Sequence, residues 1–257
     1  IHMNLDLNKL GIILFPSTRS LAFLDILRKN NIILNEVIVM GAWPFLGNDF
    51  INESKKYKYN SFFNLNDDID TIIESITKSV KYVNSTDINS DELYEILNSH
   101  QCSQYIFTGG GILKDRVLSQ NIDFIHIHPG DINNYRGSTC FYYSYLNEGV
   151  ISCTSFIMKK EIDKGEIMNI CNISQNIRID SDQKFFTDYI FDPLIRALTL
   201  EKLLCQAKLN SSIKTYVLNK YNKHQYHIAH PMIRSLFALK INENYEGNKP
   251  RRVLINE

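Results

Sequence analysis

The stretch Phe124-Ile-His-Ile-His-Pro-Gly130 alternates apolar residues with two histidines and ends in a Pro-Gly break. In an extended strand, side chains two residues apart lie on the same face. His126 and His128 should therefore project together, while Ile125 and Ile127 turn to the opposite face and pack in the core. Two titratable rings at the end of a strand indicate an active site more than they indicate packing.

The segments on both sides of this stretch alternate apolar runs with amphipathic ones. The apolar runs predict strands at 10–15, 36–40, 80–83, 104–108, 123–128, 152–159 and 166–173. Helical spacing and capping residues predict helices at 18–27, 67–79, 89–97, 113–118, 138–147 and 181–208. Between the second strand and the second helix, residues 43–66 should form a long irregular connection.

Strands separated by helices are typical of parallel βαβ units, so the sequence predicts an α/β fold with a doubly wound, mostly parallel sheet. Such sheets bind ligands beyond the carboxyl ends of their strands, where the paired histidines would lie. The length of 257 residues fits one large domain or a domain with a small appendage. We expect a catalytic domain at 3–175 and a helical or mixed C-terminal extension at 176–257.

The composition excludes several classes of partner. Twenty-eight basic residues balance 28 acidic ones, so no overall charge draws the chain to nucleic acid or to anionic lipid. No apolar run approaches the ~20 residues of a membrane helix. The five cysteines are widely spaced and form no C-x-x-C pair, which favours a reducing compartment; we expect a cytoplasmic protein. Cys140, although near the histidines, is more typical of a small buried hydrophobe than of a nucleophile.

A glycine triplet, Gly109-Gly-Gly111, follows the strand at 104–108. It does not match the dinucleotide fingerprint G-x-G-x-x-G, because Lys114 stands where the third glycine would be. A nicotinamide or nucleoside triphosphate site is therefore not expected. The triplet instead allows a ligand to approach backbone amides and carbonyls closely.

Four segments together resemble the core of the 10-formyltetrahydrofolate-dependent formyltransferases, which include methionyl-tRNA, glycinamide ribonucleotide and sugar-amine formyltransferases. The segments are Thr108-Gly-Gly-Gly-Ile-Leu113, Ile125-His-Ile-His-Pro-Gly130, Tyr135-Arg-Gly137 and Glu161-Ile-Asp-Lys-Gly165. The resemblance covers residues 104–168 well and the earlier sheet only by pattern. It implies a Rossmann-like formyltransferase fold.

The resemblance also implies a reaction, in which a formyl group moves from the co-substrate 10-formyltetrahydrofolate to a primary amine of a small molecule. We prefer an amino sugar as the acceptor. By matched position, His128 would transfer the proton and Asp163 would be its charge partner. The pterin would lie along Gly109, Gly110, Gly111, Ile112 and Leu113.

The chain departs from the family pattern at His126, which stands where the family has an asparagine that donates to the oxyanion. An imidazole N–H could replace that donor. The segment 130–134 also differs from the usual Ser-Leu-Leu-Pro stretch. Both departures leave open whether the standard activity and the usual acceptor are kept.

Two alternatives therefore remain. His126, His128 and Asp163 would suit a metal-dependent hydrolase, since two imidazoles and one carboxylate can bind a divalent metal. No further ligand stands at convincing spacing nearby, so we expect no resident metal. The second alternative is a catalytically degraded formyltransferase-like domain that only binds. Homodimer formation is also left open.

Overall fold

The computed structural model describes residues 5–44, 46–58, 61–65, 68–99, 101–161, 165–180, 185–210, 213, 215–217 and 226–256, together with the backbone of 2–3, 183–184 and 214. The strands are β1 (His2–Met3), β2 (Leu10–Leu14), β3 (Glu36–Met40), β4 (Val80–Val83), β5 (Gln104–Phe107), β6 (Asp123–His128), β7 (Arg136–Gly137), β8 (Ile151–Ile157), β9 (Ile167–Asn176), β10 (Ile213–Lys214), β11 (Tyr226–His227) and β12 (Arg252–Ile255).

The helices alternate with the strands of the first half and dominate the second half of the chain. They are the 3₁₀ turn η1 (Leu7–Lys9), α1 (Thr18–Lys29), α2 (Asn48–Lys56), α3 (Ile69–Ile76), α4 (Asp91–Asn98), α5 (Asp115–Leu118), α6 (Phe141–Glu148), α7 (Gln183–Phe186), the π-helical turn η3 (Thr187–Phe191), α8 (Asp192–Leu209) and α9 (Pro231–Glu243).

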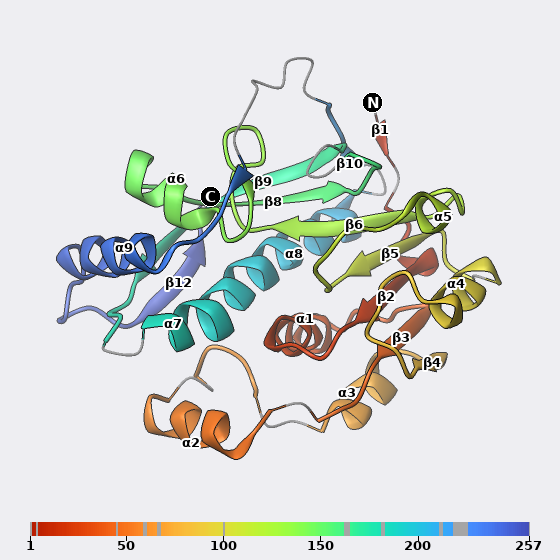
Figure 1. Ribbon diagram of the computed structural model, residues 1–257, viewed down its shortest axis with the longest axis horizontal. Coiled ribbons are helices and arrows are strands. Elements are labelled where there is room, and N and C mark those ends of the chain that lie inside the picture. The colour runs from red at the N-terminus through yellow and green to blue at the C-terminus, as the bar shows by residue number, and fades with distance from the viewer. Residues whose placement is uncertain are drawn as a thin grey trace.

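Within the described residues, eight strands form one sheet in the order β12-β9-β8-β6-β5-β2-β3-β4 (Figure 1). The five strands from β6 to β4 are parallel to one another. The other three pair antiparallel, with β8 beside β6, β9 beside β8 and β12 beside β9. The predicted α/β class with a mostly parallel sheet is confirmed.

Helices cover both faces of the sheet. Ile12 of β2 packs with apolar residues of α1, α3 and α8, whereas its neighbour Ile13 packs with those of α4 and α5. The short apolar runs of the sequence are explained by this arrangement, because a parallel strand that is buried on both faces carries no polar alternation. All five residues of β2 and of β3 are buried.

Local signals fix the ends of the helices near the sheet. Ser17 begins α1 because its hydroxyl accepts a hydrogen bond from the backbone N–H of Ser20. Gly149 ends α6 in the left-handed conformation, with φ of 73°. The helices predicted at 18–27 and 138–147 therefore end close to where the sequence places them.

Two features of the fold differ from the expected layout. Residues 43–66 were expected to be irregular, but they contain α2. The segment beyond residue 176 adds α8, which packs on α1, and β12, which pairs with β9 at the edge of the main sheet. One apolar cluster includes Leu10 and Val253 together. The apolar core and the main sheet thus both contain residues from each side of the expected division between 3–175 and 176–257. The division itself stays a prediction.

No helix in the described part of the chain is long and apolar enough to cross a membrane.

Candidate active site

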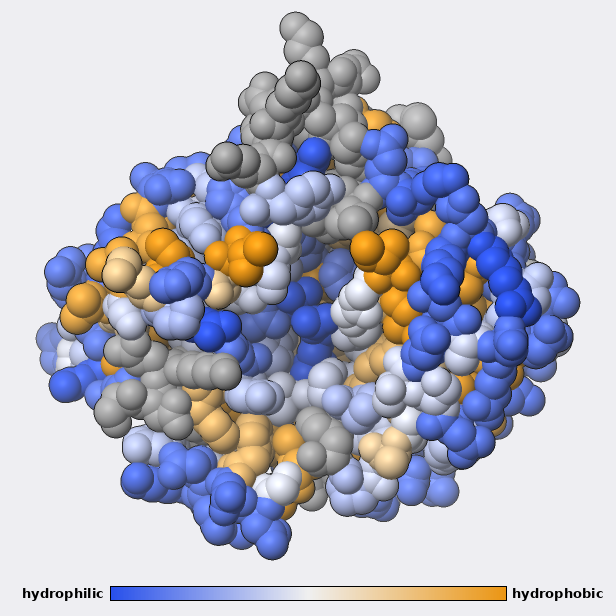
Figure 2. Space-filling model, viewed as in Figure 1, coloured by the Kyte–Doolittle hydropathy of each residue, from blue (hydrophilic) through white to orange (hydrophobic). Residues whose placement is uncertain are grey.

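A cavity of about 250 Å³ lies at the carboxyl ends of β5 and β6. Its walls come from the glycine segment after β5, the end of β6, the segment after β7, the strand end of β8, and two arginines of α1 and α8. In the view of Figure 2 the molecule is hollowed near its centre, with hydrophilic residues in the depth of the hollow. This is the edge at which a parallel sheet normally binds its ligand.

The two histidines lie as the alternation of β6 predicts. His126 and His128 both line the cavity, while Ile125 and Ile127 pack in the core on the opposite face of the sheet. Phe124, which precedes the histidines on their own face, is buried against α4 and α5. The predicted placement of the histidine pair is therefore confirmed.

His128 is held by backbone groups at the end of β6. The residue is buried, with 2% exposed, and its Nε2 lies 2.8 Å from the carbonyl oxygen of Tyr135. A carbonyl only accepts, so Nε2 must carry the hydrogen, and in the neutral ring the lone pair is on Nδ1. The backbone carbonyl of His128 in turn accepts from the thiol of Cys153 at 3.0 Å.

His126 has a setting that keeps the ring neutral. Its Nδ1 lies 3.4 Å from the carbonyl oxygen of Phe107, its partner across the strands, and its ring packs edge-on against Phe156. Burial lowers the pKa of His126 well below 6.5, and the positive charges of Arg196 and Arg19 lower it further. The neutral ring therefore donates from Nδ1 and presents its lone pair at Nε2.

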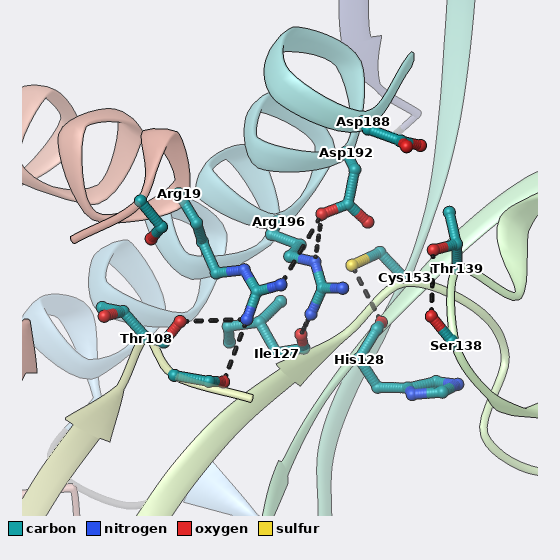
Figure 3. A network of polar contacts seen from close by, with 12 residues as sticks. Arg19, Thr108, Ile127, His128, Ser138, Thr139, Cys153, Asp188, Asp192 and Arg196 are labelled. Atoms are coloured by element: carbon teal, nitrogen blue, oxygen red, sulfur yellow. Dashed lines mark hydrogen bonds and ion pairs between the residues drawn. The ribbon is translucent and has the colours of Figure 1, made fainter. Parts of the chain in front are cut away.

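Two arginines cap the strand ends from the opposite face of the sheet (Figure 3). Arg19 donates from Nη1 to the carbonyls of Thr108 (2.9 Å) and Gly109 (3.0 Å). Arg196 donates from Nη1 to the carbonyl of Ile127 at 2.5 Å and from Nε to Asp192 at 2.9 Å. At the carboxyl end of a parallel strand, the last carbonyl groups have no backbone N–H of a neighbouring strand to accept from. The guanidinium groups donate these missing hydrogen bonds.

Asp192 holds the two arginines together. Its Oδ2 accepts from Arg196 and lies 3.9 Å from Nη2 of Arg19, and its side chain is 9% exposed. Two guanidinium groups share one carboxylate, and burial together with the charge of Arg196 lowers the pKa of Arg19 to about 9. The cluster therefore carries a net positive charge beside the histidines.

The glycine segment forms one wall of the cavity. Gly109, Gly110, Gly111, Ile112 and Leu113 all line it, as the predicted pterin site requires. At Gly109 a Cβ would lie 2.8 Å from the ring of Phe15, and Gly111 has a φ of 98°, which side-chain-bearing residues rarely adopt. The segment thus needs glycine at these two positions to keep its path beside the cavity.

The segment after β7 completes the opposite wall. β11 pairs in parallel with β7, and Ser138 donates its backbone N–H to the carbonyl of His227 at 3.0 Å. The His227 ring packs against Tyr135 and Tyr143, with centroids 5.6 and 4.5 Å away. His227 therefore supports the Tyr135-Arg-Gly137 motif through ring packing and a backbone hydrogen bond.

Asp163, the predicted charge partner of His128, lies outside the described residues, so its role stays a prediction. Cys140 is buried, as expected of a small hydrophobe. Among the residues that the structure describes, no three His, Cys, Asp or Glu side chains converge as a metal site would require. Because Asp163 is not among them, the metal set of His126, His128 and Asp163 is not tested.

Sequence reasoning missed Arg19, Asp192 and Arg196. The spacing of Asp192 and Arg196 is a signal that could have been used, since residues four apart on a helix lie on one face. An acidic and a basic residue in an otherwise apolar helix face are expected to be paired when buried. Nothing local, however, indicates that Arg19, at the start of α1, reaches the same carboxylate.

No protein-family model matches this chain, and no curated protein matches it significantly by sequence. Solved structures do match. A 4-N formyltransferase from Francisella tularensis has a TM-score of 0.51 and 12% identity, over 91% of this chain and 88% of that one. A phosphoribosylglycinamide formyltransferase from Anaplasma phagocytophilum has a TM-score of 0.50 and 14% identity, over 77% and 85%.

A sugar N-formyltransferase from Shewanella sp. is also similar, with a TM-score of 0.41 and 17% identity over 84% of this chain and 90% of that one. The assignment of the fold rests on the two structures with the higher scores. The chain has the fold of the formyltransferases.

Proposed function

We propose that this protein transfers a formyl group from 10-formyltetrahydrofolate to a primary amine of a small molecule. The observation that carries the proposal is the convergence on one cavity of the glycine segment and both histidines, which come from different strands of a formyltransferase fold. These are the segments through which the sequence resembles the folate-dependent enzymes. An amino sugar is the preferred acceptor. The balanced charge of the chain argues only against a nucleic acid as the acceptor.

In this proposal the folate lies along Gly109 to Leu113, with its formyl group toward β6. Backbone groups of that segment pair with the polar edge of the pterin. The amine attacks the formyl carbon, the carbonyl electron pair moves to oxygen, and the nitrogen must then lose a proton. His128 moves that proton, and Asp163 stabilises the charged imidazole.

The buried setting of His128 supports its part in the proposal. An imidazole fixed by its Nε2–H on the Tyr135 carbonyl keeps one tautomer, so the basic nitrogen is always Nδ1. Because the tautomer is fixed, no free energy is needed to convert the ring to the reactive tautomer before each turnover. Positioning of this kind is what general acid–base catalysis needs.

The test is a transfer assay with 10-formyltetrahydrofolate and a panel of amino sugars and amino acids. We expect formylation of at least one amino sugar. His128→Ala and Asp163→Asn should each lower kcat by about 100-fold or more, the range for a lost acid–base group. His230→Asn is the matched control, because His230 is exposed at the start of α9 and asparagine can keep its cap on Met232. Full activity in His128→Ala would contradict its role, and no transfer to any amine would contradict the proposal.

A further inference from the structure

The family asparagine that donates to the oxyanion is absent, and His126 stands in its place. In the neutral ring, Nδ1–H points to the Phe107 carbonyl at 3.4 Å, so Nε2 offers a lone pair to the cavity. A lone pair repels a developing oxyanion. In the other tautomer Nε2 would carry the hydrogen and offer an N–H to the cavity. The lone pair would then lie on Nδ1, facing the carbonyl oxygen of Phe107, and the two lone pairs would repel each other. The site therefore needs a donor besides His126.

Arg196 has the geometry of such a donor. It is 5% exposed, yet it lines the cavity. Its Nε is held by Asp192 and its Nη1 by the carbonyl of Ile127, the residue between the two histidines. Within the described part of the chain, its side chain hydrogen-bonds through Nε and Nη1 and not through Nη2. Two of the three nitrogens thus fix the guanidinium plane, and the third, Nη2, carries no dashed line to any residue drawn in Figure 3.

The chemical character of the group fits the same role. A protonated guanidinium offers a charge-assisted hydrogen bond. Such bonds are shorter and stronger than those from a neutral carboxamide. Because Asp192 and Ile127 hold the group before the substrate arrives, little reorganisation is needed when the charge develops.

We propose that Arg196 replaces the family asparagine as the oxyanion-stabilising catalytic residue, with Asp192 as its positioning residue. This inference rests on the proposed formyl transfer. The amine nitrogen forms a bond to the formyl carbon while the C=O electron pair moves to oxygen, beside Nη2 of Arg196. On collapse the C=O bond re-forms and the bond from carbon to N10 of the folate breaks. The proton lost by the amine nitrogen balances the one taken up by N10.

The experiment compares Arg196→Ala and Arg196→Lys with the unmodified protein in the transfer assay. Each variant is also titrated with tetrahydrofolate by calorimetry, which reads binding without chemistry. We expect kcat to fall about 100- to 1,000-fold in Arg196→Ala, as for removal of an oxyanion donor, with little change in the affinity for tetrahydrofolate. Added methylguanidine should restore part of that kcat, because it returns the missing donor. Lysine keeps the positive charge but lacks the planar guanidinium group, so kcat of Arg196→Lys should lie between those of the unmodified protein and Arg196→Ala.

Arg234→Gln is the matched control. Arg234 also pairs with an aspartate, Asp188 at 3.0 Å, but it lies on α9 and does not line the cavity. We expect its kcat to match that of the unmodified protein. A merely structural role for Arg196 predicts something different: weaker tetrahydrofolate binding in Arg196→Ala and no rescue by methylguanidine, and that result would overturn the inference.

The outcomes separate the two proposals. If the unmodified protein transfers formyl groups and Arg196→Ala keeps its kcat, only the role of Arg196 is overturned. If the unmodified protein transfers none, the proposed function is overturned and the role of Arg196 with it. Should Arg196→Ala fail to fold, Arg196→Lys decides, since unchanged kcat in a folded Arg196→Lys also contradicts the inference.

Discussion

At the scale of the residue, the most informative position is His126. Its ring lies between Phe107 and Phe156, and two guanidinium groups from α1 and α8 approach it from the other face of the sheet. Apolar neighbours and positive charges both oppose protonation. The imidazole of His126 is therefore neutral and fixed, and it does not act as an acid. In this it differs from the proposed proton-transfer role of His128.

The lowered pKa of His126 predicts a pH dependence of stability. In the unfolded chain the ring takes up a proton near pH 6.5, whereas in the folded protein its pKa lies well below that. The unfolded state therefore binds more protons as the pH falls below about 6.5, and the folded state loses stability by up to about 1.4 kcal/mol per pH unit. Above pH 6.5 this contribution is fully present.

His126→Asn provides the comparison, because an amide does not titrate. We expect the free energy of unfolding, measured with denaturant from pH 7.5 to pH 5, to fall more steeply in the unmodified protein than in His126→Asn. All other titrating groups are common to both proteins and cancel in the difference. Parallel curves would show that His126 is protonated as readily in the folded protein as in the unfolded chain.

At the scale of the element, the pairing of β7 with β11 depends on a missing side chain. Gly137 has a φ of 117°, and a Cβ at this position would lie 2.2 Å from the carbonyl oxygen of His227. Gly137→Ala should therefore separate the two strands and open the wall of the cavity that Ser138 forms. Hydrogen exchange at the Ser138 N–H, which bonds to His227, reports the separation directly.

Gly149→Ala is the control for backbone strain alone. Gly149 also has a positive φ, 73°, but nothing lies within 4 Å of its missing Cβ. Its substitution should cost about 1–2 kcal/mol and leave the exchange of Ser138 unchanged. A Gly137→Ala protein with normal protection at Ser138 would contradict the steric account.

Most elements were predictable because their signal is local. β2 and β3 are short apolar runs, and α1 and α6 carry their own capping residues. The helix α2 was missed because Ser54 is its only fully buried residue among those described, so an apolar stripe is absent. The pairing of β12 with β9 joins residues far apart in sequence, and no local pattern reveals it.

The site was predictable to the same extent. The alternation in β6 places both histidines correctly, and the glycine segment falls on the same edge because it also follows a parallel strand. Arg19 and Arg196 could not be placed, because their meeting at Asp192 depends on how α8 packs against α1. Such contacts are set by tertiary packing rather than by the spacing of residues.

At the scale of the whole molecule, the burial of the cysteines predicts their reactivity. Cys102, Cys140, Cys153 and Cys171 are buried, and Cys205 is half-buried on α8. Burial raises the pKa of Cys153 to about 12. Only the thiolate reacts, so a thiol reagent at pH 8 should modify Cys205 first and the other four only on unfolding. Rapid modification of Cys140 with loss of transfer activity would instead support a role of Cys140 as a nucleophile, which the sequence pattern disfavours.

The central claim is that the cavity at the ends of β5 and β6 binds a reduced folate. Gly110 lines this cavity, and nothing lies within 4 Å of its missing Cβ, so Gly110→Phe should fill the space without disturbing the fold. Gly47 has the same open surroundings away from the cavity, and Gly47→Phe is the matched control.

The decisive measurement is a calorimetric titration of the three proteins with tetrahydrofolate. We predict binding to the unmodified protein and to Gly47→Phe, and loss of binding in Gly110→Phe. An unmodified protein that does not bind tetrahydrofolate, or a Gly110→Phe protein that binds it equally well, would contradict the account.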